Sequence, residues 1–486
     1  MCNCTCNLDS FTSLRNLDAD LTNYEERWCK ERTERTNKLR KLFFPNQVHI
    51  INHSSSLGTL TKELEQFEKQ RIDTQNAINI LSSHDSNAID NLAKSLITLS
   101  SQKPCPLCQI LKNEEFLHAL SNSLTYDFLS ADDLSLLIGA LASIFPFCGN
   151  LQEDIINDGI CIYLSNFIES DNVKILESCL YLIRSISSSS NYARDAILCM
   201  GLYSQLISIA KRQISEPMTI AACECLRIIF SFDDDADSQI LTSCISPIIE
   251  LLQIPLKPAI IQVIECLVEI TNKVPSLVFV FFDLGIVGNI ISLLDDPDIQ
   301  GPALKLAGNM SVSQPQQIKE MLSYGLLDKL SKLFHTKYVS DTLWIISNLL
   351  ESVPDSIAPI FNSNFVQQLI GLSNDCTFEI KKEISFLLAT LIVFSSDEIT
   401  FKMITPEVVG ILVEMLGCGC INITMRCLDA IVDFIRVIIS VQKFDLFDVF
   451  IEEGLRDRLE DLEDTSNENI AERANYITSQ LNNYSN

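Results

Sequence analysis

Glycine and proline are scarce in this chain, with 15 of each among 486 residues. Each makes up about 3% of the chain, roughly half of the average usage. A β-sandwich or barrel requires turn residues about every 8–12 positions, and a dinucleotide-binding fold requires glycines at its phosphate-binding turn. The scarcity of both residues therefore argues against these two fold classes.

Basic side chains are also in deficit, because 36 Lys and Arg face 63 Asp and Glu, for a net charge of −27. A protein of this sign repels phosphate backbones, so nucleic acid is not expected as a direct ligand. The natural electrostatic match is a cationic partner. The deficit is uneven, since residues 1–73 carry eleven side chains of each sign and the rest of the chain holds the whole net charge.

Two further features indicate a reduced, intracellular protein without a membrane span. No N-terminal stretch joins a basic region to an apolar one in the manner of a secretory signal. The most apolar run, residues 275–294, contains Asp283 and Asn289 and is expected to form a buried helix. Eighteen cysteines occur, and most lie in apolar helical patterns as small core residues: Cys179, Cys223, Cys266 and Cys427.

From about residue 78 the chain reads as short apolar helices separated by brief polar breaks. A small or polar residue followed by an apolar one, with Leu or Ile five positions later, recurs nine times at intervals of 39 to 47 residues. These markers are Glu115, Gly159, Gly201, Cys244, Gly285, Gly325, Asn364, Glu407 and Gly454. A helical repeat of this length is typical of armadillo and HEAT proteins, so we predict an all-α solenoid with a long concave surface.

The same register, carried backward, defines pairs at i and i+4 on one inward face of the helix that lies before each marker. These pairs are Leu137/Leu141, Tyr181/Ser185, Glu224/Ile228, Glu265/Glu269, Lys305/Asn309, Trp344/Asn348 and Phe386/Thr390. The spacing predicts that they line the concave groove.

At these positions the sequence resembles the importin-α adaptors of nuclear import, whose third helices carry Trp-x-x-x-Asn. Residues 344–348 are that motif intact, and residues 303–309 resemble its basic variant with Gly-Asn. Residues 380–386 resemble the helix entry with Phe in place of Trp. Residues 191–198 resemble an early repeat of the family, and residues 450–481 resemble its last repeat.

The resemblance implies a right-handed armadillo superhelix of about nine to ten repeats over residues 78–486, whose groove receives basic localisation peptides. Asn can both donate to and accept from a peptide backbone, and an aromatic face attracts Lys by about 0.5–2 kcal/mol. In the family, acids three residues before the aromatic serve the second peptide site, and here Asp341 and Glu383 hold those positions. The expected peptide contacts are Lys305, Asn309, Asp341, Trp344, Asn348, Glu383, Phe386, Tyr181, Glu224 and Glu265.

The larger, N-terminal peptide site of the family is not intact in this sequence. Its three Trp/Asn pairs fall on Leu137/Leu141, Tyr181/Ser185 and Glu224/Ile228, and its lysine-binding acid falls on Ser189. We expect this site to be weak, altered or lost. Glu224, Glu265 and Glu269 either attract basic cargo by charge or form a solvated helix face.

The head, residues 1–72, contains a basic segment with almost no apolar stripe. A segment of this kind is either a solvated charged tail or a helix that folds on an acidic partner. It resembles an eroded importin-β-binding segment, which implies partial disorder and contacts to importin-β through Arg27, Lys30, Arg32, Arg35, Lys38, Arg40 and Lys41. The family's second, autoinhibitory basic cluster is missing from residues 43–50.

The resemblance therefore predicts a nuclear import adaptor that shuttles between cytoplasm and nucleus. Its partners would be importin-β, cargo with basic localisation peptides and, for release, a nuclear export receptor with Ran-GTP. The alternative is an armadillo scaffold for protein–protein interaction that is not dedicated to import. The eroded N-terminal site favours the scaffold, whereas the basic head favours import.

An enzyme is not expected, and neither is a cofactor or a metal. Cys105 and Cys108 form a lone CxxC without a second pair, and Cys2, Cys4 and Cys6 form a thiol-rich start. Five scattered histidines form no recognisable arrangement with an acid and a nucleophile, and no glycine-rich phosphate loop occurs.

Overall fold

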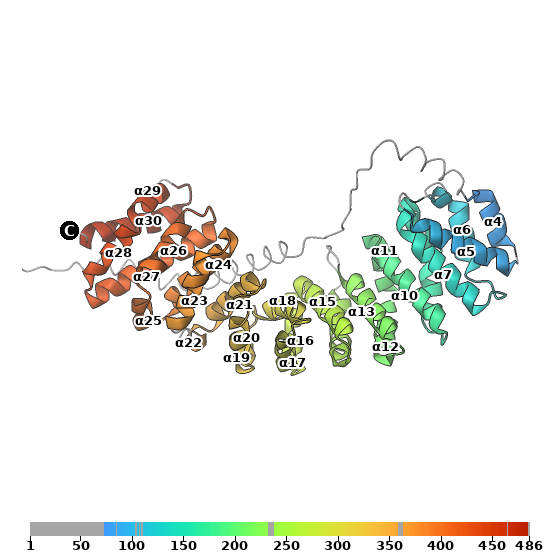
Figure 1. The fold of residues 1–486 in the computed structure, drawn as a ribbon, viewed down its shortest axis with the longest axis horizontal. Coiled ribbons are helices and arrows are strands. Elements are labelled where there is room, and N and C mark those ends of the chain that lie inside the picture. Colours follow the sequence, from blue (N-terminus) through green and yellow to red (C-terminus); the bar gives the residue numbers. More distant parts are fainter. Residues whose placement is uncertain are drawn as a thin grey trace, which may run out of the picture. The chain divides into compact units, whose positions relative to one another are not determined.

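The computed structural model describes residues 72–83, 85–102, 105, 107, 110–231, 238–357, 363–463 and 465–484. Every regular element within these ranges is a helix, and none of them is a strand. Figure 1 shows the ribbon. The structure therefore confirms the predicted all-α helical-repeat class.

The chain divides into two compact units, the first ending at Val280 and the second continuing from Phe281. The first unit begins with α4 (Thr74–Ser82), α5 (Ser86–Ser100), η1 (Ile110–Lys112), α6 (Glu114–Ser123), α7 (Ala131–Ile144), η2 (Phe145–Phe147) and η3 (Gly149–Leu151). It continues with α8 (Gln152–Asn157), α9 (Ile160–Phe167), α10 (Val173–Ser187), α11 (Asn191–Cys199), α12 (Leu202–Arg212), α13 (Glu216–Phe230), α14 (Ser238–Ile249), η4 (Glu250–Gln253), α15 (Lys257–Lys273) and η5 (Pro275–Val278).

The chain passes into the second unit within α16 (Phe279–Asp283). The helices that follow show the same order of shorter helices and a longer third helix. They are α17 (Val287–Ser292), η6 (Leu293–Asp295), α18 (Gln300–Met310), α19 (Pro315–Ser323), α20 (Leu326–Ser331), α21 (Val339–Ser352), α22 (Pro354–Ile357) and α23 (Ser363–Asn374). After these come α24 (Phe378–Phe394), α25 (Asp397–Lys402), α26 (Pro406–Leu416), α27 (Ile421–Val441), η8 (Phe444–Leu446), α28 (Phe447–Glu452), α29 (Leu455–Glu463) and α30 (Glu468–Tyr484).

Two shorter helices and a longer third helix form the repeating group within each unit. In the first unit the third helices α7, α10, α13 and α15 contact one another in that order. In the second unit α18, α21, α24, α27 and α30 do the same (Figure 1). Each apolar face is thus buried against the next repeat, which is the stabilising principle of repeat proteins. The armadillo type and the number of repeats stay predictions.

The sequence markers correspond to a turn followed by a core anchor. Five of the nine are glycines with a left-handed backbone, with φ between 64° and 91°, and each precedes the second helix of its repeat: Gly159, Gly201, Gly285, Gly325 and Gly454. Glycine adopts this conformation without the steric cost that a Cβ imposes. The Leu or Ile five residues after every one of the nine markers is at most 4% exposed.

The turn at Gly325 offers a direct test of this reading. Gly325 has a φ of 77° and its side-chain position faces open space, so Gly325→Ala should cost only the backbone strain, about 1–2 kcal/mol. Gly371 is also exposed and open, but it lies inside α23 with ordinary φ. Gly371→Ala should therefore raise the free energy of unfolding by about 0.5–1 kcal/mol. Urea unfolding measures the change in the free energy of unfolding, which should be negative for Gly325→Ala and positive for Gly371→Ala. A lower free energy of unfolding in both variants would contradict this assignment of the turn.

The apolar run of residues 275–294 departs from the expectation of one buried helix. It forms η5, α16, α17 and the start of η6, with the break at Gly285, whose φ is 64°. No single helix among the described residues has the length and hydropathy of a membrane span, although Pro275–Asp283 and Val287–Asp295 taken together have both. The marker at Gly285 carried the signal for the break, because the left-handed residue ends the first helix of its repeat.

The cysteine prediction is confirmed for the four positions named from sequence. Cys179, Cys223, Cys266 and Cys427 are free thiols that are at most 1% exposed. Burial raises the pKa of the Cys223 thiol to about 12, so it remains a neutral, apolar group at physiological pH. These cysteines act as small core side chains.

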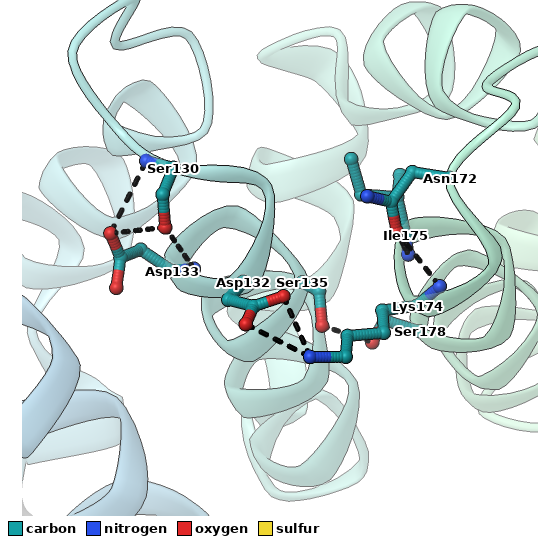
Figure 2. Close-up of polar contacts among 8 residues, drawn as sticks. All are labelled: Ser130, Asp132, Asp133, Ser135, Asn172, Lys174, Ile175 and Ser178. Atoms are coloured by element: carbon teal, nitrogen blue, oxygen red, sulfur yellow. Dashed lines mark hydrogen bonds and ion pairs between the residues drawn. The ribbon is translucent and has the colours of Figure 1, made fainter.

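Polar contacts join neighbouring third helices along their solvent side. Lys174 Nζ on α10 donates to both carboxylate oxygens of Asp132 on α7, at 2.8 and 2.9 Å. Ser178 Oγ donates to Ser135 Oγ at 3.4 Å one turn further along, as Figure 2 shows. Both contacts join residues about one repeat apart, which is the spacing at which the later ion pairs also occur.

Candidate peptide-binding surface

The predicted peptide contacts of the second unit lie on three consecutive third helices. Lys305 and Asn309 are on α18, Asp341, Trp344 and Asn348 are on α21, and Glu383 and Phe386 are on α24. Because α18 contacts α21 and α21 contacts α24, the repeat places these residues on adjacent rows.

A cluster of three charged side chains forms across these helices. Asp341 is half-buried, and burial raises the pKa of its carboxyl group above the ordinary value of 3.8. Lys305 acts in the opposite direction, while the negative charge of Glu383 raises the pKa further. Lys305 is exposed and Glu383 is half-buried. A cation entering from solvent would meet two carboxylates that repel one another and are opposed by one lysine.

The raised pKa of Asp341 has a consequence for stability. When the pKa of a carboxyl group is higher in the folded than in the unfolded protein, the group contributes most to the free energy of unfolding below its unfolded pKa. That contribution is lost as the pH rises through the folded pKa. Asp341→Asn should therefore be more stable than the wild type at pH 7, and the difference should vanish near pH 3. Thermal unfolding across this pH range measures it.

Asp295 provides the control of opposite sign. The hydrogen bond from Lys329 lowers the pKa of the Asp295 carboxyl group. The stabilising contribution of the Asp295 carboxylate is present above its unfolded pKa and is lost in acid. Asp295→Asn should therefore be slightly less stable than the wild type at pH 7. A stabilising Asp295→Asn together with a destabilising Asp341→Asn would contradict both assignments.

Trp344 lies in the packing between repeats, with 8% of its surface exposed. A Cβ built on Gly308 of α18 would come within 2.6 Å of indole Cζ3, so the ring rests directly against the backbone of the preceding third helix. The indole Nε1 is buried and has no hydrogen-bond partner among the described residues. Trp344 therefore presents little of its ring to a ligand, contrary to the groove position expected for it.

The two groove asparagines are also buried. Asn348 is 1% exposed, and its Nδ2 donates to Ser311 Oγ at 3.2 Å. Ser311 Oγ in turn donates to the carbonyl of Gly308 at 2.7 Å. Asn309 is 4% exposed. The expectation that Asn348 holds a peptide backbone is corrected here, because its amide joins two repeats of the protein itself.

Phe386 faces a cation that belongs to the chain. Its ring is 5% exposed, and Cζ of Arg426, on α27, lies 5.0 Å from the ring centroid. The same guanidinium pairs with Glu351 on α21, with Nη2 2.6 Å from Oε1. The expected contact of Phe386 with a peptide lysine is therefore corrected: the ring face is already covered. Sequence reasoning did not single out Arg426, although it lies about one repeat after Phe386.

In the first unit, two predicted acids have arginine neighbours. Glu224 on α13 pairs with Arg184 on α10 at 3.1 Å. Glu265 on α15 pairs with Arg227 on α13 at 3.4 Å. The arginines precede their partners by 40 and 38 residues, close to one repeat, and this spacing is the signal that could have identified them. The predicted acidic stretch is thus partly neutralised.

The remaining predicted groove positions of the first unit divide between surface and core. Tyr181 is exposed, whereas Ser185 is buried and its Oγ donates to the carbonyl of Ala142 at 2.7 Å. Leu137 and Leu141 are fully buried core residues. Tyr181 is therefore the aromatic of this set that remains accessible to a ligand.

Several predicted residues lie outside the described part of the chain. They are the importin-β contacts Arg27, Lys30, Arg32, Arg35, Lys38, Arg40 and Lys41, together with Cys2, Cys4, Cys6 and Cys108. Within the described ranges, no group of three or more His, Cys, Asp or Glu side chains is arranged to hold a metal ion.

Comparisons with known proteins bear on the fold. No family model and no curated protein matches the sequence. The crystal structure of an engineered protein, a target of the Northeast Structural Genomics Consortium, is similar with a TM-score of 0.72 and 17% sequence identity. The match covers 85% of this chain and 99% of the engineered protein. At this identity the likeness supports the helical-repeat fold alone.

Proposed function

We propose that this chain is a helical-repeat adaptor that binds basic protein segments on its third helices and acts in nuclear import. The observation that carries the proposal is Asp341, whose carboxyl pKa is raised by burial and, against the effect of Lys305, by the negative charge of Glu383 on the neighbouring helix. A lysine or arginine between these two acids would relieve that repulsion and the burial of Asp341.

The charge of the whole body supports a cationic ligand. The net charge of −27 resides beyond residue 73. Such a field raises the association rate of a basic segment and weakens as salt screens it. Lys305, which is near Asp341, would repel a basic side chain of the ligand placed next to it. The site would therefore select segments by the spacing of their basic residues as well as by their charge.

The import part of the proposal rests on the resemblance to importin-α adaptors. The head would bind importin-β through its basic segment, while the body would hold cargo. A nuclear export receptor with Ran-GTP would complete the cycle, and the protein would shuttle between cytoplasm and nucleus. The head and the body thus have separate partners, so they are separable by mutation.

A second candidate, an interaction scaffold that binds no localisation peptide, is favoured by a different observation. Phe386, Asn348, Glu224 and Glu265 all have partners within the protein. A surface whose polar and aromatic groups are satisfied internally offers fewer of the contacts that lysine recognition requires.

Pull-downs with the full-length protein test the import proposal. The head variant Lys38→Glu/Arg40→Glu/Lys41→Glu should lose importin-β and keep a Lys-rich peptide. The body variant Asp341→Asn/Glu383→Gln should show the reverse. If the wild type binds neither importin-β nor any basic peptide, the import proposal fails and the scaffold is favoured.

A further inference from the structure

Arg426 joins three consecutive third helices of the second unit. It lies on α27, its ion-pair partner Glu351 lies on α21, and Phe386 and Phe394 lie on the intervening α24. The guanidinium carbon is 5.0 Å from the Phe386 ring centroid and 5.9 Å from that of Phe394. The ion pair measures 2.6 Å, with side chains 8% and 10% exposed.

This contact departs from the rule of the repeat. In repeat proteins each unit contacts its nearest neighbours, and four other ion pairs between third helices in the described part of the chain follow that rule at spacings close to one repeat. Arg426 and Glu351 are 75 residues apart, so their pair passes over one complete repeat. The side chain of Arg426 therefore crosses α24 and covers the ring of Phe386.

The surroundings of Arg426 are chemically those of a guanidinium-binding site. A carboxylate accepts a charge-assisted hydrogen bond, and aromatic faces attract the planar cation. Lysine would match this site less well, because its compact and strongly hydrated ammonium lacks the planar fork and stacks poorly on a ring. The site differs from the cluster of Asp341 and Glu383 because its cation is supplied by the chain.

We propose that Glu351, Phe386 and Phe394 form an arginine-binding site that the chain keeps filled with its own Arg426. The class of ligand that the site would accept in the absence of Arg426 is an arginine side chain. The inference goes beyond the proposed function, since it uses other residues and holds whether or not the chain binds importin-β or lysine-rich cargo.

Removal of Arg426 tests the site in the full-length protein. N-acetyl-arginine amide at millimolar concentration should leave the melting temperature of the wild type unchanged. It should raise that of Arg426→Ala in a saturable manner. N-acetyl-lysine amide should bind the variant about tenfold more weakly, because its ammonium lacks the planar guanidinium that stacks on the two rings while it donates to the carboxylate. Adding Glu351→Gln to Arg426→Ala should abolish the preference for arginine.

Two controls keep the test decisive. If Arg426→Ala does not fold, Arg426→Gln, which retains the aliphatic stem, enters the same titrations with the same expected results. Lys174→Ala, which removes the exposed partner of Asp132, should gain no arginine response. Equal responses to arginine and lysine derivatives, or no response in either Arg426 variant, would overturn the proposal.

Discussion

Replacing Glu351 with leucine is expected to lower the free energy of unfolding of the second unit by about 3–5 kcal/mol. The substitution leaves the guanidinium of Arg426 buried without its carboxylate, and both side chains are at least nine-tenths buried. An uncompensated buried charge is among the most destabilising single changes in a protein. Trp344 lies in this unit and is one of two tryptophans, so fluorescence in a Trp28→Phe background reports this unfolding directly.

A double substitution separates the charge from the packing. Glu351→Leu/Arg426→Met should recover most of the loss, because an apolar pair of similar volume needs no compensation. The exposed pair of Asp132 and Lys174 is the matched surface control, and Asp132→Asn should cost less than about 1 kcal/mol. A loss no larger for Glu351→Leu than for Asp132→Asn would show that the bridge over α24 is absent in solution.

Trp344→Ala is expected to destabilise the protein by about 3–5 kcal/mol, the range found for large core aromatics. The reason is that the indole is buried and packs directly against Gly308, which has no side chain. Removal of the indole would therefore leave a cavity between the two helices. Circular dichroism during urea unfolding measures the loss, since the fluorescent group is removed. Trp344→Phe, which retains part of the ring, should cost clearly less.

The contact with Gly308 supplies an independent check. Gly308→Ala places a Cβ 2.6 Å from the indole and should cost about 1–3 kcal/mol in the wild type. In the Trp344→Ala background the same change should cost much less, because the two sites are coupled. If Trp344→Ala weakens peptide binding without a loss of stability, the residue is an exposed groove contact and the packing described here is wrong.

The repeat was predictable from sequence because its signal is local. A glycine with positive φ and an apolar anchor five residues later depend on a few neighbouring residues, and the chain repeats them about every 42 positions. Gly285 shows the limit of hydropathy alone, since the surrounding run reads as one helix and the left-handed turn divides it.

The candidate site was less predictable because its contacts join different repeats. Asn348 and Trp344 match a groove motif, yet Ser311 and Gly308 of the preceding repeat determine that they are buried. The sequence placed Asp341 and Glu383 in one register, and in the structure the charge of Glu383 contributes to the raised pKa of Asp341. A partner 75 residues away, as for Arg426, gives no local pattern.

The asymmetry between these residues bears on function. Among the predicted contacts, Asp341 is an acid whose ionisation is opposed by burial, whereas Glu224 and Glu265 form ion pairs with arginines. Proteins commonly retain such locally unfavourable groups where a ligand binds, and removal then gains stability at the expense of function. Asp341→Asn should therefore be a more stable protein that binds less.

Calorimetric titration of a Lys-rich peptide into the full-length protein tests the central claim most directly. Asp341→Asn/Glu383→Gln should bind about tenfold more weakly than the wild type at low salt, and the difference should shrink as salt is raised. Because Asp341→Asn is expected to be stabilising at neutral pH, unfolding would not explain the loss. Equal affinity of the two proteins at low salt would contradict the assignment of this surface to basic segments.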